Sequence, residues 1–234
     1  MSGRAGDGDF HSLTVRRSTS HRATERPSGP AAQRPTARPS PQPSNVGGLE
    51  QLIRDQAAAP RLLTIDVVTF DDEIEHTHSF AQPAEVTIDL VPRGSTALYD
   101  AVGLSLNGFG GALGNLPEHA RPGTVLVTIV TDGEENASSD YTAGTIKQIG
   151  NHQREVFDWD ISFLGANQDA VLEAQKIGVD PGDALDYDLG AVGSSMIAHS
   201  AKLSRCRQGD KTGYTAAERL KAAGYDETPT PPQS

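Results

Sequence analysis

The chain of 234 residues lacks the usual marks of a secreted or membrane protein. It contains a single cysteine, Cys206, which excludes an internal disulfide. It has no run of about eighteen apolar residues, the length that a transmembrane helix requires, and no charged and then apolar leader. From these absences we expect a cytoplasmic protein without membrane association.

Positive charge is also scarce. The 20 Lys and Arg residues are outnumbered by 31 Asp and Glu residues, so the formal net charge is -11. A nucleic-acid-binding protein usually presents a basic face to the phosphate backbone. We therefore expect protein partners and no binding of nucleic acid.

Aliphatic residues disappear from one long segment near the N-terminus. Between Val15 and Val46 there is no Val, Ile, Leu, Met or Phe, while Arg, Pro and Ser abound. Such a segment cannot bury enough apolar area to offset the entropy of ordering it. The predicted organisation is a disordered Arg/Pro/Ser-rich segment at 1–45 with an optional first strand at 10–15, a folded domain at 46–208, and a C-terminal extension with a disordered tail at 209–234.

From residue 47 onward, the apolar residues alternate between helical and strand spacing. Helical spacing occurs at 47–56, 95–113, 141–156, 168–178 and 191–207, and strand patterns occur at 61–70, 73–80, 124–131, 160–167 and 184–190. The almost continuous apolar run at 124–131 favours a central strand covered on both faces. This order of units predicts an α/β fold, doubly wound, with a mostly parallel central sheet and helices on both faces.

Two loops of this predicted fold could form a ligand site, because open α/β sheets bind ligands at the carboxyl ends of their strands. Asp132 directly follows the strand at 124–131, although Asp-Gly after a strand is also ordinary turn chemistry. Upstream, Gly94 allows a tight backbone and Thr96 offers a hydroxyl at the mouth of a helix. There, Ser95 or Thr96 could instead be a plain helix cap. Neither loop alone decides between these roles.

Taken together, three segments resemble a known family. "PRGSTALYDAVG", "VTIVTDGEENAS" and "FLGANQDA" are similar to the von Willebrand factor A family, in particular to its small intracellular-type prokaryotic and phage members. The resemblance runs from about Gly47 to Leu220. It implies a Rossmann-like fold with a metal-ion-dependent adhesion site, in which an Asp-x-Ser-x-Ser loop, a Thr and a second Asp surround one divalent ion. An acidic side chain of the partner commonly completes the coordination.

Carried onto this chain, the resemblance makes Thr96 and Asp132 ligands of Mg²⁺ or Mn²⁺. Ser18 and Ser20 have the spacing of the first motif, but Arg16 stands where its Asp belongs. A unit positive charge about 5 Å from a divalent ion is repelled by roughly 6 kcal/mol at an effective dielectric constant near 20. We therefore expect an impaired metal site, caused by divergence of the motif or by a reading-frame disruption within 16–45.

The rim of this site is expected to contact the partner. We assign that role to four residues, Gly94, Ser95, Gly133 and Glu134. Glu134 and Glu135 are interpreted as solvated turn acids. The predicted function is recognition of another protein through an acidic side chain of that partner, without enzymatic activity. Two alternatives stay open, a phosphotransferase or hydrolase that uses Asp132 and Asp158, and a degraded copy without function.

Overall fold

The structure is a computed structural model that describes residues 6–16, 45–90, 95–166 and 169–225. Within these residues six strands form one sheet in the order β3-β2-β1-β4-β5-β6. The strand β3 runs antiparallel to β2, and the other neighbouring pairs are parallel. The strands are β1 (Gly6–Arg16), β2 (Leu62–Phe70), β3 (Ile74–Ala81), β4 (Pro122–Thr131), β5 (Asp160–Ala166) and β6 (Ala184–Tyr187).

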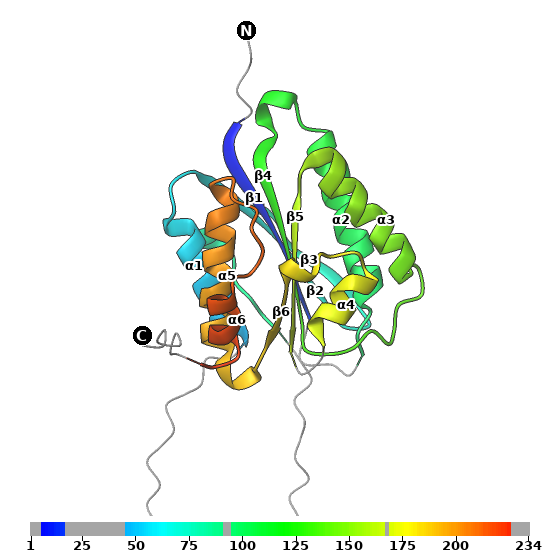
Figure 1. Cartoon of the computed structure of the whole chain (residues 1–234). Helices are drawn as coiled ribbons and strands as arrows, with labels where there is room; N and C mark the ends of the chain where they lie inside the picture. The colour runs from blue at the N-terminus through cyan, green and yellow to red at the C-terminus, as the bar shows by residue number, and fades with distance from the viewer. Residues whose placement is uncertain (1–5, 17–44, 91–94, 167–168, 226–234) are drawn as a thin grey trace, which may run out of the picture.

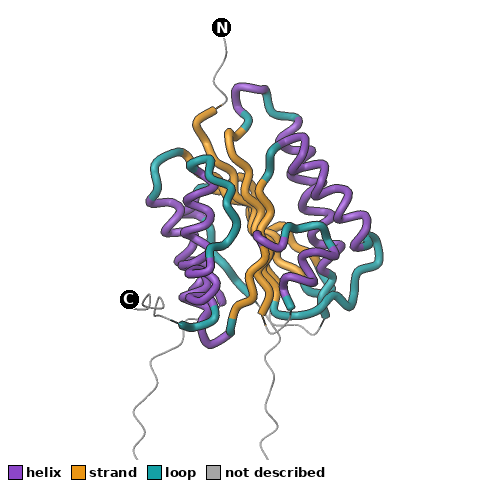
Figure 2. The backbone as a smooth tube through the Cα atoms, viewed as in Figure 1, coloured by secondary structure: helices purple, strands orange, loops and turns teal. Residues whose placement is uncertain are grey.

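Helices lie on either side of this sheet (Figures 1 and 2), with α1, α5 and α6 on one side and α2, α3 and α4 on the other. The helices are α1 (Asn45–Ala58), α2 (Leu98–Gly114), α3 (Ala143–Phe157), α4 (Ala170–Lys176), α5 (Val192–Arg207) and α6 (Ala216–Ala222). Four single-turn 3₁₀ helices occur among the described residues, at Pro83–Glu85, Glu118–Ala120, Pro181–Asp183 and Leu189–Ala191. The predicted α/β class is confirmed.

The two sides of the sheet bury two separate apolar clusters. In β4, Ile129 belongs to the cluster that includes residues of α2, α3 and α4, whereas Val130 belongs to the cluster that includes residues of α1 and α5. Successive residues of a strand point to opposite faces, so β4 is covered on both sides. Every residue from Val125 to Thr131 is buried, and β4 lies between β1 and β5. This confirms the expectation of a central, two-sided strand at 124–131.

The ends of the helices follow local sequence signals. Thr142 caps α3 by accepting a hydrogen bond from Thr145 N, and Thr215 forms a capping box with Glu218 at the start of α6. After α4, Gly178 adopts φ 81°, a left-handed conformation in which glycine is favoured. These signals explain why the periodic segments end within a few residues of their predicted boundaries.

The sheet extends beyond the domain that we predicted at 46–208. The optional strand at 10–15 corresponds to β1, which pairs with β2 on one side and β4 on the other, so residues 6–16 lie in the middle of the sheet. At the other end, α6 lies within the predicted extension at 209–234, and its Ala222 belongs to a buried cluster. Residues 17–44, to which most of the disorder prediction applies, lie outside the described residues.

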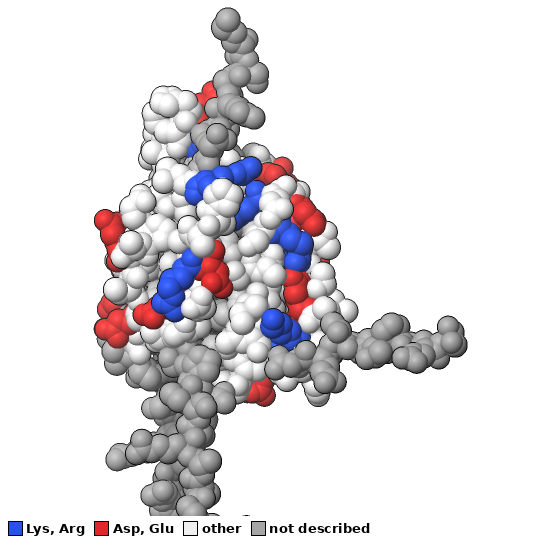
Figure 3. Space-filling view, turned by 90° about the vertical axis from the view of Figure 1, so that its left-hand side faces the viewer, with Lys and Arg blue, Asp and Glu red and all other residues white. Residues whose placement is uncertain are grey.

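The described surface shows no large region of one charge on the side that carries α1, α5 and α6, where Lys and Arg residues alternate with Asp and Glu residues (Figure 3). Among the described residues, no helix combines the length and apolar character needed to cross a membrane.

Candidate functional site

The loop before α2 is held between the loops that follow β2 and β4, at the carboxyl edge of the sheet. Ala97 N donates to Asp71 O, directly after β2, at 2.7 Å. Thr96 N donates to Asn136 Oδ1 at 2.8 Å, and Asn136 N donates back to Thr96 O at 3.0 Å. Both backbone groups of Thr96 are therefore used, so its position relative to the loop after β4 is set by the backbone.

The hydroxyl of Thr96 is a buried polar group at this edge. Thr96 is 0 % exposed, and among the described residues its Oγ1 has no hydrogen-bond partner. The N-cap of α2 is Ala97, without a side-chain cap bond, so the helix-cap interpretation of Ser95 or Thr96 is wrong. A buried hydroxyl without a partner is costly, and hydroxyl oxygen is a ligand that Mg²⁺ accepts. Thr96 therefore fits the role of a metal ligand.

Asp132 lies where the sequence predicted it, directly after β4, and is half-buried. The preceding Thr131 steadies the turn, because its Oγ1 donates to Gly133 O at 3.0 Å. Of the predicted rim residues, Ser95 and Gly133 are half-buried and Glu134 is exposed. Thr96 and Asp132 thus sit on two loops that hydrogen bonds join.

The first metal motif is described only up to its first residue. Arg16 ends β1, where the ladder pairs Arg16 with Phe70 of β2 and Val15 with Val130 of β4. The chain therefore leaves β1 at the same edge as the loops of Thr96 and Asp132, as the motif requires. Ser18, Ser20 and Gly94 lie outside the described residues.

Glu135 is not a solvated turn acid, which corrects the sequence interpretation. Its carboxylate accepts hydrogen bonds from Tyr99 N at 2.9 Å, Ala137 N at 2.9 Å and Ser138 N at 2.7 Å. Ser138 Oγ donates to it as well, at 2.7 Å. Because Tyr99 lies in the first turn of α2, Glu135 supplies from another loop the cap that α2 lacks in its own sequence.

Asp100 of α2 makes the reverse contact, from α2 to the loop after β4, and the sequence did not predict this role. Its carboxylate accepts from Ser139 N at 2.8 Å, Asp140 N at 3.0 Å and Tyr141 N at 2.7 Å. An acid in the first turn of a helix was the only sequence signal for it. Glu135 and Asp100 both serve the backbone, and no group of three or more His, Cys, Asp or Glu suited to a metal ion is found in the part of the chain that the structure describes.

The structure separates the two acids of the hydrolase alternative. Asp132 follows the carboxyl end of β4, whereas Asp158 ends α3 and precedes the amino end of β5. Because β4 and β5 are parallel, these positions lie at opposite edges of the sheet. The Asp158 carboxylate is exposed and forms an ion pair with Lys211. Joint catalysis by Asp132 and Asp158 is therefore excluded.

A second polar cluster is enclosed between α5 and the sheet. Lys202 Nζ lies 2.7 Å from Asp160 Oδ1 and 3.0 Å from Asp183 Oδ1, and it donates to Ser162 Oγ at 2.8 Å. Burial lowers the pKa of Lys202, but the charges of Asp160 and Asp183 outweigh it and raise this pKa overall. Lys202 and Ser162 are both 0 % exposed, so we interpret this cluster as part of the core.

Cys206 adjoins the same cluster and is expected to be unreactive. Burial, followed by the charge of Asp160, raises the pKa of its thiol to about 12, and the residue is 1 % exposed. Because only the thiolate reacts, alkylation near pH 8 should be at least about a hundredfold slower in the folded protein than in denaturant. Mass spectrometry of iodoacetamide-treated protein measures this directly, since the chain has one cysteine. Similar alkylation rates in the folded and the denatured protein would contradict the burial of Cys206 beside this cluster.

Comparisons with known proteins identify the fold. No protein-family model and no curated protein matches the sequence. Among solved structures, manganese-loaded TRAP protein from Plasmodium vivax matches with a TM-score of 0.53 and 14% identity, over 84% of this chain and 74% of that chain. Proximal thread matrix protein 1 from the mussel byssus matches with a TM-score of 0.50 and 16% identity, over 88% of this chain and 46% of that chain.

A third structure carries the family name. The von Willebrand factor type A protein from Catenulispora acidiphila matches with a TM-score of 0.50 and 11% identity, over 84% of this chain and 42% of that chain. This chain thus spans less than half the length of the mussel and Catenulispora structures. At such identities the likeness concerns the fold, which here is a six-stranded sheet with an antiparallel β3 at one edge. The chain has the fold of a von Willebrand factor A domain.

Proposed function

We propose that this chain is a protein-binding von Willebrand A-like domain whose divalent-metal site, at the carboxyl edge of the sheet, is impaired. The observation that carries the proposal is the buried hydroxyl of Thr96, which has no partner among the described residues although both backbone groups of Thr96 are bonded. Thr96 and Asp132 would hold Mg²⁺ or Mn²⁺. A bound ion would supply an open coordination position for a carboxylate of the partner.

The proposed impairment comes from the end of β1. A basic residue, Arg16, occupies the backbone position that ends this strand at the metal edge. Thr96 and Asp132 contribute one hydroxyl and one carboxylate, which is little to offset the dehydration of Mg²⁺. The neighbouring acids do not compensate for the missing ligands. Glu135 and Asp100 instead accept hydrogen bonds from backbone N–H groups of α2 and of the loop after β4. The site is therefore expected to be weak.

Binding without turnover is the proposed activity. The exposed Glu134 and the half-buried Ser95 and Gly133 would form the rim that contacts the partner. Lys202 and Asp160 are buried and therefore closed to a substrate. Hydrolysis of a phosphate or ester by the purified chain, lost on Asp132→Ala, would instead favour an enzyme.

The metal site can be tested by calorimetry with Mg²⁺ and Mn²⁺. The unaltered chain should bind either ion with a dissociation constant of about 1 mM or higher, which corresponds to a binding free energy of about -4 kcal/mol. Arg16→Asp changes the local charge by two units and restores the first acid of the motif, so we expect at least a tenfold gain in affinity. Adding Asp132→Ala should abolish that gain.

The adjacent Arg17 provides the matched control. Arg17→Asp makes the same change in net charge at a motif position that accepts any residue, so it should leave metal affinity within about threefold of the unaltered chain. An equal gain in metal affinity from Arg16→Asp and Arg17→Asp would show that the effect comes from net charge alone. Tight binding by the unaltered chain, or no gain in Arg16→Asp, would refute the proposed impairment.

A further inference from the structure

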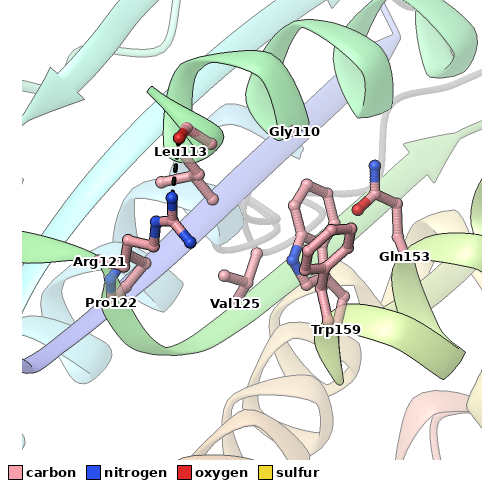
Figure 4. Close-up of a pocket in the computed structure, with 9 residues that line it drawn as sticks. Gly110, Leu113, Arg121, Pro122, Val125, Gln153 and Trp159 are labelled. Carbon is pink, nitrogen blue, oxygen red and sulfur yellow. Dashed lines mark hydrogen bonds between the residues drawn. The ribbon is translucent and has the colours of Figure 1, made fainter. Parts of the chain in front are cut away.

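A small pocket lies at the amino edge of the sheet, away from the loops of Thr96 and Asp132. It has a volume of about 120 Å³ and lies between the C-terminal turns of α2 and α3 and the start of β4 (Figure 4). Its apolar walls are formed by Leu113, Val125, Phe157 and Trp159. Leu113, Val125 and Trp159 are nearly buried, while Phe157 is 55% exposed. The pocket thus offers a flat aromatic wall and an open side.

One polar atom of this pocket has no partner. Gln153 is 6 % exposed, and among the described residues its Oε1 accepts no hydrogen bond. The amide is oriented by its other end, because Nε2 donates to Leu106 O at 3.5 Å. Exchanging the two amide atoms would set two oxygens against each other. Gln153 lines the pocket, and in Figure 4 its oxygen lies on the side of the Trp159 ring.

The pocket is of the size that holds one aromatic ring. An engineered protein cavity of about 150 Å³ with apolar walls binds benzene. Here the unpartnered acceptor adds a chemical requirement, because a ligand without a donor would leave Gln153 Oε1 buried and unsatisfied. Arg121 also lines the pocket, where its guanidinium donates to Leu116 O and Gly114 O, and its charge disfavours cationic ligands.

We propose that this pocket binds a single-ring aromatic compound that carries an O–H or N–H donor and no positive charge. The ring packs between Trp159 and the aliphatic walls, and the donor bonds to Gln153 Oε1. Phenol is the simplest probe of this chemistry, and toluene is its counterpart without a donor. The site is independent of the metal edge, so its test does not depend on the proposed function.

The single tryptophan of the chain makes the test direct. In a heteronuclear NMR spectrum the one indole N–H signal belongs to Trp159, in the pocket wall. Phenol should shift this signal saturably, and it should bind more tightly than toluene. Gln153→Met keeps a similar volume but removes the acceptor, so phenol affinity should fall about tenfold while toluene affinity stays within about twofold.

Two neighbouring glycines of α2 provide a second test. A Cβ on Gly110 would lie 2.7 Å from Gln153 Nε2, so Gly110→Ala must displace the amide and should weaken phenol binding. A Cβ on Gly111 would meet nothing within 4 Å, so Gly111→Ala gives the same gain in helix propensity and should bind phenol as the unaltered chain does. No saturable shift with phenol, or equal affinities for phenol and toluene that Gln153→Met leaves unchanged, would overturn the proposal.

Discussion

Replacement of Lys202 by methionine should lower the free energy of unfolding by about 3–5 kcal/mol at pH 7. The reason is the charge that the substitution leaves behind. Lys202 is 0 % exposed and contacts Asp160 and Asp183, which are themselves largely enclosed. Methionine fills much of the same volume but cannot neutralise the two carboxylates. Denaturant unfolding followed by the fluorescence of Trp159 measures the loss.

An exposed lysine in an ion pair supplies the control. Lys176 forms an i,i+3 pair with Glu173 on α4, and its side chain is 54% exposed. Lys176→Met should therefore cost no more than about 1 kcal/mol. In the Lys202→Met background, replacing both acids by asparagine should recover most of the lost stability, because the uncompensated charge is removed. Equal losses of stability in Lys202→Met and Lys176→Met would show that the side chains of the buried cluster are not charged.

The deficit of the Lys202→Met variant should also depend on pH. Burial raises the pKa of Asp183 even with Lys202 present, and removal of the lysine strengthens that effect. An acid whose pKa is raised by folding gains stability as pH falls through its folded pKa towards its unfolded value near 4. The difference in the free energy of unfolding between the variant and the unaltered chain should therefore narrow as pH falls from 7 to about 4.

Glu135→Ala should lower the free energy of unfolding by about 2 kcal/mol. The substitution removes the acceptor of Tyr99 N, Ala137 N and Ser138 N together, and half-burial of Glu135 limits how well water replaces it. Because the same loop bonds to both backbone groups of Thr96, hydrogen exchange should accelerate at Thr96 and at Ala97. Chemical denaturation and amide exchange report these two effects separately.

Glu134 is the matched control for this prediction, since it has the same chemistry one residue earlier and is exposed. Glu134→Ala should change stability by less than about 0.5 kcal/mol. If both variants lost the same stability, net charge rather than capping of α2 would explain the effect.

Periodicity predicted most of the fold because most elements carry their own pattern. The strand β4 is continuously apolar, and α3 has both helical spacing and a capping threonine. The strand β1 has few aliphatic residues, so its boundaries could not be predicted, and its place in the sheet depends on pairing with β2 and β4. The short helix α6 was missed because the segment around it was interpreted as an extension.

The candidate site could be predicted only in part. The position of Asp132 follows from the end of an apolar strand, a local signal. The role of Glu135 could not be predicted from its neighbours, because it depends on the distance to Tyr99 N, which the packing of α2 sets. The unpartnered hydroxyl of Thr96 could not be predicted either, since only the structure shows that Ala97 is the N-cap of α2 without a side-chain cap bond.

The central place of β1 has a consequence for folding. Without β1, the pair β3-β2 and the group β4-β5-β6 would share no ladder, because β1 lies between β2 and β4. Its partners on the β4 side are distant in sequence, as the pairing of Val15 with Val130 shows. Contacts of this separation form slowly, since loop closure precedes any gain from pairing. During synthesis, β1 must therefore stay unpaired on one side until β4 has emerged from the ribosome, and the two halves of the sheet can join only then.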